Sequence, residues 1–171
     1  MANIFFLIFC ISLLPMLIFA PWIPTRKKDI QRIITSSWID SESVVYDLWS
    51  WDWKVLFNIS ERIDCRLIGI ESYFPLYLYS IIKKNLFYKE KNIEFKLKNF
   101  FRCDLSDATH IYIFWLEWKM HRLEEKLKKE CKPKTKIISY TFELPTFKLI
   151  KKDKPTEDVL SLFIYEMPPL E

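Results

Sequence analysis

The chain of 171 residues contains a single glycine, Gly69, and this scarcity is its most unusual feature. Average glycine usage is about 7%, so a chain of this length would carry roughly a dozen. Glycine adopts positive φ without steric cost, and an α/β domain with almost none is difficult to build. The chain has seven tryptophans, and we hypothesise that most of them stand where the organism uses glycine. The simplest cause is a UGA codon that the source cell reads as glycine. The alternatives are deliberate substitution and a native aromatic strand.

Several classes of site have no matching pattern in the sequence. The four cysteines are widely spaced without a C-x-x-C pair, which argues against zinc and against a disulfide scaffold. His110 and His121 are the only histidines, and we interpret both as structural. No nucleophilic triad and no base-stacking module is visible. We therefore expect neither a metal site nor a nucleic-acid partner.

Charge is modest in total but clustered along the chain. The formal net charge is +4, and the segments 83–102 and 119–136 are both rich in Lys and Arg. We interpret each segment first as a solvated surface. Attraction to an anionic membrane surface is a second role that such clusters can play in a tethered protein.

The first part of the chain predicts a membrane anchor. Residues 4–20 are almost entirely apolar, and no charged side chain precedes Arg26. About 17 to 21 such residues are the minimum that crosses a bilayer. No basic residue precedes the run, and Phe19-Ala20-Pro21 is a poor cleavage site, so an uncleaved anchor over residues 1–22 is favoured over a signal peptide or a buried helix. Arg26-Lys27-Lys28 follow, which predicts a single-pass protein of the cell membrane with its main domain in the cytoplasm.

The rest of the chain divides into a neck with its following helix, residues 23–43, and a domain over residues 44–171. Apolar periodicity predicts helices over 26–37, 54–63, 74–88 and 116–131, and strands over 44–48, 66–71, 93–97, 109–114, 136–140 and 159–165. Strand and helix alternate, so we expect an α/β fold with a mostly parallel sheet and helices on both faces. Ligands of such sheets bind outside the carboxyl ends of the strands.

The segment after the first predicted strand carries the most specific motif. Residues 47–54 read Asp-Leu-Trp-Ser-Trp-Asp-Trp-Lys. With glycine at Trp49, Trp51 and Trp53 this becomes D-x-G-x-G-x-G, the form found in methyltransferases. A glycine-rich turn between strand and helix lets main-chain N–H groups approach a ligand closely. Glu71 ends the next predicted strand, where a carboxylate can accept both hydroxyls of a ribose.

The stretch from Pro21 to Tyr165 resembles small membrane-anchored class I S-adenosylmethionine (SAM) dependent methyltransferases, related to the lysine methyltransferases of the ATP synthase c subunit. The segments that carry the resemblance are Pro24-Thr25, Val44–Lys54, Ile68–Glu71, Asn99–Phe101, Asp104–Ala108 and Ser139–Pro145. The resemblance implies a Rossmann-like class I methyltransferase sheet behind an N-terminal transmembrane helix, with SAM as the cofactor.

The resemblance also implies roles for individual residues. Asp47 and the backbone at Trp49, Trp51 and Trp53 would hold the methionine end of SAM, Glu71 the ribose, and Asn99 and Phe100 the adenine, while Thr25 would close the site from the neck. Glu117, after the fourth predicted strand, is the only candidate beside the methyl acceptor. As written, three indoles would fill the cofactor cleft, so we predict that the literal sequence does not bind SAM and is inactive.

These expectations lead to a protein acceptor, with lysine favoured, and to the membrane and a protein substrate as partners. Two alternatives remain open. The first is a non-catalytic, membrane-tethered protein with a degenerate methyltransferase fold, and the second is a methyltransferase for a lipid or another small molecule. The coding DNA distinguishes the enzyme from the degenerate protein, because UGA at positions 49, 51 and 53 favours the former and UGG the latter.

Overall fold

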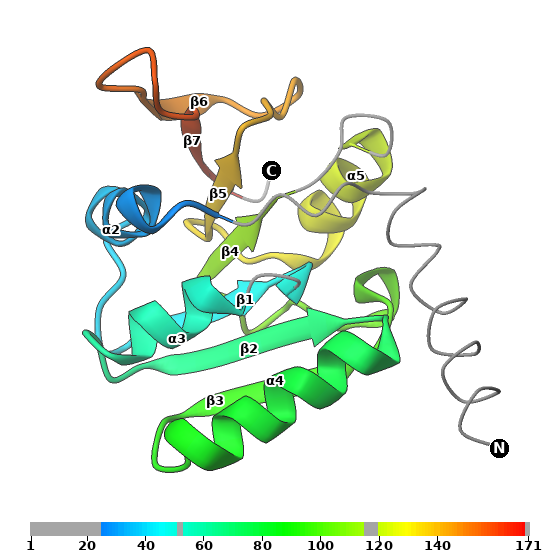
Figure 1. The fold of residues 1–171 in the computed structure, drawn as a ribbon. Coiled ribbons are helices and arrows are strands. Elements are labelled where there is room, and N and C mark those ends of the chain that lie inside the picture. The colour runs from blue at the N-terminus through cyan, green and yellow to red at the C-terminus, as the bar shows by residue number, and fades with distance from the viewer. Residues whose placement is uncertain (1–24, 51–52, 115–119, 170–171) are drawn as a thin grey trace, which may run out of the picture.

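The computed structural model describes residues 25–50, 53–114 and 120–169 (Figure 1). The helices are α2 (Lys27–Ser36), α3 (Lys54–Ser60), α4 (Phe74–Phe87), the short 3-10 helix η2 (Phe100–Arg102) and α5 (Met120–Glu130). The strands are β1 (Val44–Asp47), β2 (Arg66–Glu71), β3 (Ile93–Leu97), β4 (His110–Ile113), β5 (Lys136–Tyr140), β6 (Leu149–Asp153) and β7 (Leu162–Glu166). The predicted anchor over residues 1–22 lies outside the described residues, and within them no helix is long and apolar enough to span a bilayer.

The strands form one sheet in the order β3-β2-β1-β4-β5-β7-β6. The pairs among β1 to β5 are all parallel, whereas β7 runs antiparallel to both β5 and β6. This arrangement confirms the predicted α/β fold with a mostly parallel sheet. The chain order reverses direction between β1 and β4, which is the switch point where open α/β sheets bind ligands.

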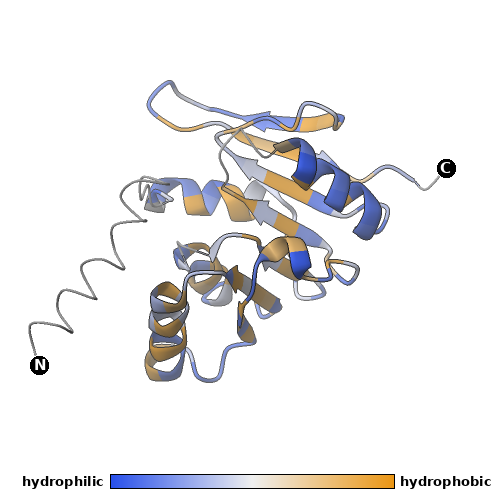
Figure 2. Cartoon of the chain, turned by 90° about the vertical axis from the view of Figure 1, so that its right-hand side faces the viewer, coloured by the Kyte–Doolittle hydropathy of each residue, from blue (hydrophilic) through white to orange (hydrophobic). Residues whose placement is uncertain are grey.

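Helices cover both faces of the sheet, as predicted. In Figure 2, α4 lies at lower left and α5 at upper right, on opposite sides of the strands. Alternate residues of each strand point to opposite faces. Tyr46 and Ile68 therefore belong to the core beneath α5, whereas Val45 and Leu67 belong to the core beneath α2, α3 and α4. Burial on both faces explains why the central strands read as continuous apolar runs.

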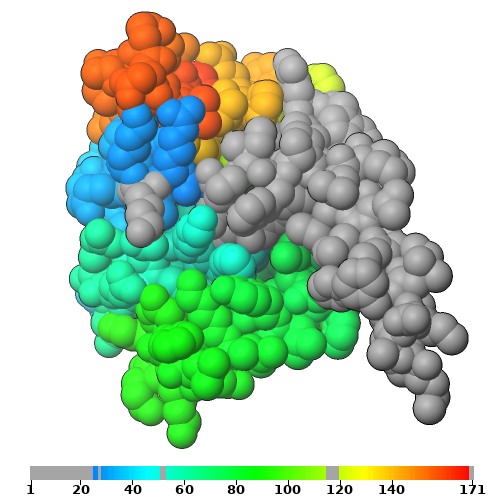
Figure 3. Space-filling view, viewed as in Figure 1, coloured from blue at the N-terminus to red at the C-terminus, as the bar shows by residue number. Residues whose placement is uncertain are grey.

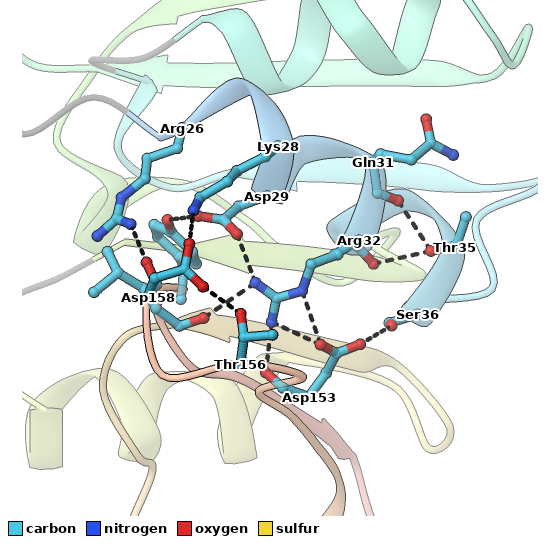
Figure 4. Close-up of polar contacts among 12 residues, drawn as sticks. Arg26, Lys28, Asp29, Gln31, Arg32, Thr35, Ser36, Asp153, Thr156 and Asp158 are labelled. Atoms are coloured by element: carbon cyan, nitrogen blue, oxygen red, sulfur yellow. Dashed lines mark hydrogen bonds and ion pairs between the residues drawn. The ribbon is translucent and has the colours of Figure 1, made fainter.

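A polar cluster fastens α2 to the hairpin of β6 and β7 (Figure 4). The Arg32 guanidinium lies between two carboxylates: Nη1 donates to Asp29 Oδ1 at 2.6 Å and Nε to Asp153 Oδ1 at 2.8 Å. An exposed ion pair between Lys28 and Asp158 lies nearby. Because Thr25 lies just before α2, this cluster also determines where the neck meets the domain.

The strand β6 was missed by the sequence prediction, which placed one final strand over 159–165. Leu149 and Ile150 of β6 are exposed, and two lysines follow them, so the segment has no apolar alternation. It is an edge strand, and among the described strands it pairs only with β7. Charged side chains are typical of edge strands because they discourage pairing with another chain.

Trp38 occupies a backbone conformation that suits glycine. It follows Ser37, the C-cap residue of α2, and has φ of 56° with 52% of its surface exposed. Helices commonly end with a glycine in this left-handed conformation. A side chain there costs about 1–2 kcal/mol per residue. The structure thus supports the glycine hypothesis at a position far from the D-x-G-x-G-x-G motif.

Replacing Trp38 by glycine is expected to raise the free energy of unfolding by about 1 kcal/mol, because the left-handed strain disappears. Trp38→Ala is the matched control, since it removes the indole and its cation–π contacts with Lys136 and Lys151 but keeps a Cβ. Urea titration of both variants measures the difference. A glycine variant no more stable than the alanine variant would contradict the interpretation.

Candidate active site

Asp47 lies at the centre of the sheet edge where the site was expected. It ends β1 and pairs in register with Gly69 of β2 and Tyr112 of β4. Its side chain is buried, and its Oδ1 accepts a hydrogen bond of 3.2 Å from the N–H of Trp49. The carboxylate therefore shapes the turn that leads from β1 into α3, at the switch point of the sheet.

Gly69 is required by a close approach between this turn and β2. A Cβ built at Gly69 would lie 2.6 Å from Ser50 Oγ and 2.6 Å from the Phe95 ring, closer than real contacts allow. The Ser50 hydroxyl is buried and has no hydrogen-bond partner among the described residues. The absence of a side chain at Gly69 thus lets the turn after β1 lie directly against the neighbouring strand.

Glu71 presents a buried carboxylate oxygen without a partner. Only 1% of the residue is exposed, and its Oε1 accepts a hydrogen bond of 2.7 Å from the N–H of Tyr73. Within the described part of the chain nothing pairs with Oε2. Burial raises the pKa of Glu71 to about 7. A buried carboxylate oxygen without a partner suits a ligand whose hydroxyl groups donate hydrogen bonds, as those of the ribose of SAM do.

The other described candidates lie at the same edge of the sheet but differ in their burial and in their hydrogen bonds. Thr25 is buried, with its hydroxyl 3.1 Å from that of Tyr112, so the neck meets β4 beside Asp47. Asn99 follows β3 and is exposed, and its Oδ1 caps η2 by accepting from the N–H of Phe101 at 3.0 Å. Phe100 is buried. The structure thus places each of these residues at the carboxyl end of a strand or over one.

A family model described as the ANTKMT methyltransferase domain matches residues 47–151, which is more than half of the chain. The chain belongs to this family. The match begins at Asp47, so it includes the turn after β1, Glu71 and the segment after β3. Residues 1–46, with the predicted anchor and the neck, lie outside it.

Known proteins extend the likeness beyond the family model. A protein-lysine N-methyltransferase from Saccharolobus islandicus (strain REY15A) is 28% identical over 130 residues, covering 72% of this chain and 78% of the relative. An RNA methyltransferase from Salinibacter ruber, solved with S-adenosyl-L-homocysteine, has a TM-score of 0.79 at 22% identity, covering 87% of this chain and 96% of that one. A methyltransferase from Pyrococcus furiosus has a TM-score of 0.61 at 13% identity, covering 98% and 100%. This ANTKMT-family chain is a SAM-dependent methyltransferase with a Rossmann-like fold.

Two tryptophans of the D-x-G-x-G-x-G motif pack partly against the hydrophobic cores on the two faces of the sheet. Trp49 is half-buried against the core beneath α5, whereas Trp53 packs against the core of the other face. The Trp53 ring lies 4.5 Å from the ring of Tyr79, and its Nε1 is buried without a partner among the described residues. An unpaired buried donor costs about 1–3 kcal/mol. Trp51 and Glu117 lie outside the described residues.

Thr141 is a site candidate that the sequence interpretation missed. It follows β5 at the same edge of the sheet, and its φ is 85°, an unusual value for a β-branched residue. Its Oγ1 is buried without a partner in the described part of the chain. Strained backbone of this kind gathers at functional sites. Its position in the segment Ser139–Pro145, which carried part of the family resemblance, was the only sequence signal.

His110 lies at the opposite edge, at the start of β4. Its Nε2 is 3.0 Å from the carbonyl oxygen of Ser37, and its Nδ1 is 2.9 Å from Thr109 Oγ1. Burial lowers the pKa of this imidazole. These contacts join the end of α2 to β4 and agree with the structural interpretation of His110.

Proposed function

We propose that this ANTKMT-family chain transfers the methyl group of SAM to a lysine side chain of a protein. The observation that supports it most directly is the unpartnered, buried oxygen of Glu71 beside the turn after Asp47, since this acceptor suits the ribose of SAM. The acceptor class is supported by the relative from Saccharolobus islandicus, which is a protein-lysine N-methyltransferase.

Most of the candidate residues would hold the cofactor, and the others would lie beside the methyl acceptor. In the proposed arrangement, Asp47 and the backbone of residues 49–53 hold the methionine end, and Glu71 holds the ribose. Asn99 and Phe100 flank the adenine, and Thr25 closes the site from the neck. Bound SAM supplies a sulfonium-activated methyl group. The protein then has to position an uncharged amine about 3–3.5 Å from that methyl, which is the near-attack geometry.

The half-buried Phe114 at the end of β4, which packs on the fully buried Tyr140 of β5, offers an apolar surface for the acceptor amine. The rings of Phe114 and Tyr140 lie 5.0 Å apart, edge to face. The Tyr140 hydroxyl donates to Asp29 at 2.6 Å, so its polar end is engaged away from the amine. Apolar surroundings lower the pKa of an amine and favour its neutral, nucleophilic form. In this proposal Glu117, which follows β4 in the sequence, receives the proton or orients the amine.

We also propose that residues 1–22 anchor the enzyme in the cell membrane, with the catalytic domain in the cytoplasm. The support is the uncharged run of residues 4–20, followed by the basic residues Arg26, Lys27 and Lys28. An anchored enzyme would meet membrane proteins at high local concentration, so its acceptor is expected in the membrane fraction.

One experiment tests the acceptor and the anchor together. Membranes from cells producing the chain with glycine at positions 49, 51 and 53 are washed with alkaline carbonate and incubated with methyl-labelled SAM. We expect the enzyme to stay with the washed membranes and a protein band to gain label on lysine, as identified by mass spectrometry. Release of the enzyme by carbonate would contradict the anchor. Label confined to lipid or to residues other than lysine would contradict the acceptor class.

A further inference from the structure

The helix α4 is apolar on both of its sides. Tyr77 and Ile81 pack inward against the core beneath α2, α3 and α4. Six large apolar residues of the helix are exposed, and we call them the α4 outer face: Phe74, Leu78, Tyr79, Ile82, Leu86 and Phe87. The Tyr79 ring also lies against the Trp53 ring, with the ring centroids 4.5 Å apart. The exposed fraction reaches 69% for Leu86 and 73% for Phe87. A helix that is apolar all round is normally buried, so the outer face indicates a missing partner.

This face is prominent at one end of the sheet. The helix α4 packs over β2 and over the edge strand β3. Figure 3 shows its side chains, in green, standing at the surface of the lower part of the molecule. Leu97, the last residue of β3, is also exposed and extends the apolar surface at the end of that strand.

The charge around the α4 outer face is mostly positive. The helix contains no acidic residue and has two lysines near its C-terminus. Lys89 and Lys91 follow it, both exposed and without an ion-pair partner in the part of the chain that the structure describes. Residues 83–102 hold seven Lys or Arg and two Glu. Large apolar side chains beside unpaired lysines are the combination by which helices bind in the headgroup region of anionic bilayers.

The same charge argues against a second copy of this chain as the occupant. Pairing of two α4 outer faces in a dimer would bring two lysine-rich rims together, and like charges at an interface oppose association. An acidic, apolar protein surface would also match the charge, but it would have to match the shape of this face as well. A bilayer needs no shape complementarity, because acyl chains adapt to a convex surface.

We propose that the α4 outer face docks on the surface of an anionic lipid bilayer, with Lys89 and Lys91 contacting lipid headgroups. The docked helix brings the β3 edge of the domain to the membrane. The inference goes beyond methyl transfer and does not depend on the acceptor. Its test therefore uses a readout that loss of activity would leave unchanged.

The experiment measures how deeply single positions lie in a bilayer. The full chain is placed in nanodiscs of phosphatidylcholine alone or with about one third phosphatidylserine, carrying a spin label at Leu78→Cys or Leu86→Cys. Glu125→Cys on α5, exposed on the other side of the sheet, is the control position. Cys10, which lies in the apolar run of residues 4–20, is replaced by serine in every labelled chain, and label on the chain without added cysteine gives the remaining background. This background is expected to be low because Cys65, Cys103 and Cys131 are buried.

In anionic nanodiscs we expect both α4 labels to gain collision with oxygen and lose collision with an aqueous nickel complex, each by at least threefold relative to neutral nanodiscs. The label at position 125 should show the same collision rates in neutral and anionic nanodiscs. The double variant Lys89→Glu/Lys91→Glu is expected to abolish the response. Lys129→Glu/Lys132→Glu, with the same change of charge on and after α5, should keep it.

Two results would overturn the proposal. One is equal accessibility of the α4 labels in neutral and anionic nanodiscs. The other is dipolar coupling between labels at position 86 of separate chains, with shielding already complete in detergent micelles, which would assign the face to a second copy. Unchanged circular dichroism of the lysine variants excludes misfolding as the cause of a lost response.

Discussion

Glycine at positions 49, 51 and 53 together is expected to increase the affinity for SAM at least a hundredfold, from a Kd above about 1 mM to one near 10 μM. The turn between β1 and α3 must bring main-chain N–H groups to the cofactor, and side chains at these three positions obstruct that approach. In the described part of the turn, Trp49 and Trp53 are half-buried, and the Trp53 indole N–H has no partner among the described residues. Removing the indoles both frees the turn and removes that unpaired donor.

Calorimetric titration with SAM measures the change. Trp38→Gly is the matched control, because it makes the same substitution at a site that also favours glycine but lies outside the cofactor turn. It should stabilise the chain and leave SAM affinity as weak as before. Equal, tight binding by the tryptophan and glycine chains would contradict the steric argument. Absence of binding by both would favour the non-catalytic alternative with a degenerate site.

The coding DNA provides a second, independent check on the same hypothesis. If UGA encodes positions 38, 49, 51 and 53, the natural protein carries glycine at each. The conformation at Trp38 is the structural reason to expect this outside the motif, because its φ of 56° favours glycine. UGG codons at all four positions would instead make the tryptophans native.

Much of the fold was predictable because the central strands are buried on both faces. The bounds of β2, β3 and β5 agree with the sequence prediction, since uninterrupted or alternating apolar residues mark each strand. The edge strand β6 carries no such pattern, because a strand with one neighbour and an exposed face has little apolar surface to bury. Apolar periodicity therefore indicates which strands are buried. It does not reveal a strand such as β6, which is defined by its backbone pairing with β7.

The candidate site was predictable where it depends on strand ends. Asp47 and Glu71 could be placed at one edge because parallel strands end together. The contact between the Thr25 and Tyr112 hydroxyls joins residues far apart in the sequence, and only the packing of the neck on β4 brings them together. The strain at Thr141 was equally hidden, since φ is determined by the tertiary position of the loop after β5.

The apolar character of α4 was visible in the sequence, but the exposure of one side was not. A sequence pattern shows that a helix has apolar residues on a face, and it does not show how many such faces the domain covers. Here the sheet covers only one, because β3 is the edge strand among the residues that the structure describes.

Glu71→Ala, made in the glycine-restored chain, is expected to weaken SAM binding by about 10- to 100-fold, which corresponds to about 1.4–2.8 kcal/mol. The buried Oε2 would lose its role as acceptor for a ribose hydroxyl, and no other described residue pairs with it. Glu71→Gln keeps one acceptor oxygen of similar geometry. We expect it to retain more of the affinity than alanine, because a hydrogen bond to a neutral acceptor is weaker than one to a carboxylate.

The pH dependence of SAM binding distinguishes a ribose-binding role of Glu71 from a merely structural one. Burial raises the pKa of Glu71 from 4.5 to about 7. The carboxylate is the better acceptor, so the affinity for SAM should rise about tenfold between pH 6 and pH 8 and level off above the pKa. Glu71→Gln has no titrating group at this position and should bind SAM with an affinity that varies little over that range. A wild-type-like slope in the Gln variant would contradict the assignment.

Without cofactor, the free energy of unfolding should fall over the pH range in which the affinity for SAM rises. The unfolded chain releases the Glu71 proton near pH 4.5, whereas the folded chain keeps it until about pH 7. Folding therefore favours the protonated form, and stability is lost as pH rises from 4.5 through 7. Glu71→Gln should remove this loss. Because ribose hydroxyls stabilise the carboxylate, the bound cofactor should lower the pKa of Glu71 and release protons near neutral pH. Calorimetric titration in buffers of different ionisation enthalpy measures that release, and binding without proton release at pH 6.5 would exclude Glu71 as the ribose acceptor.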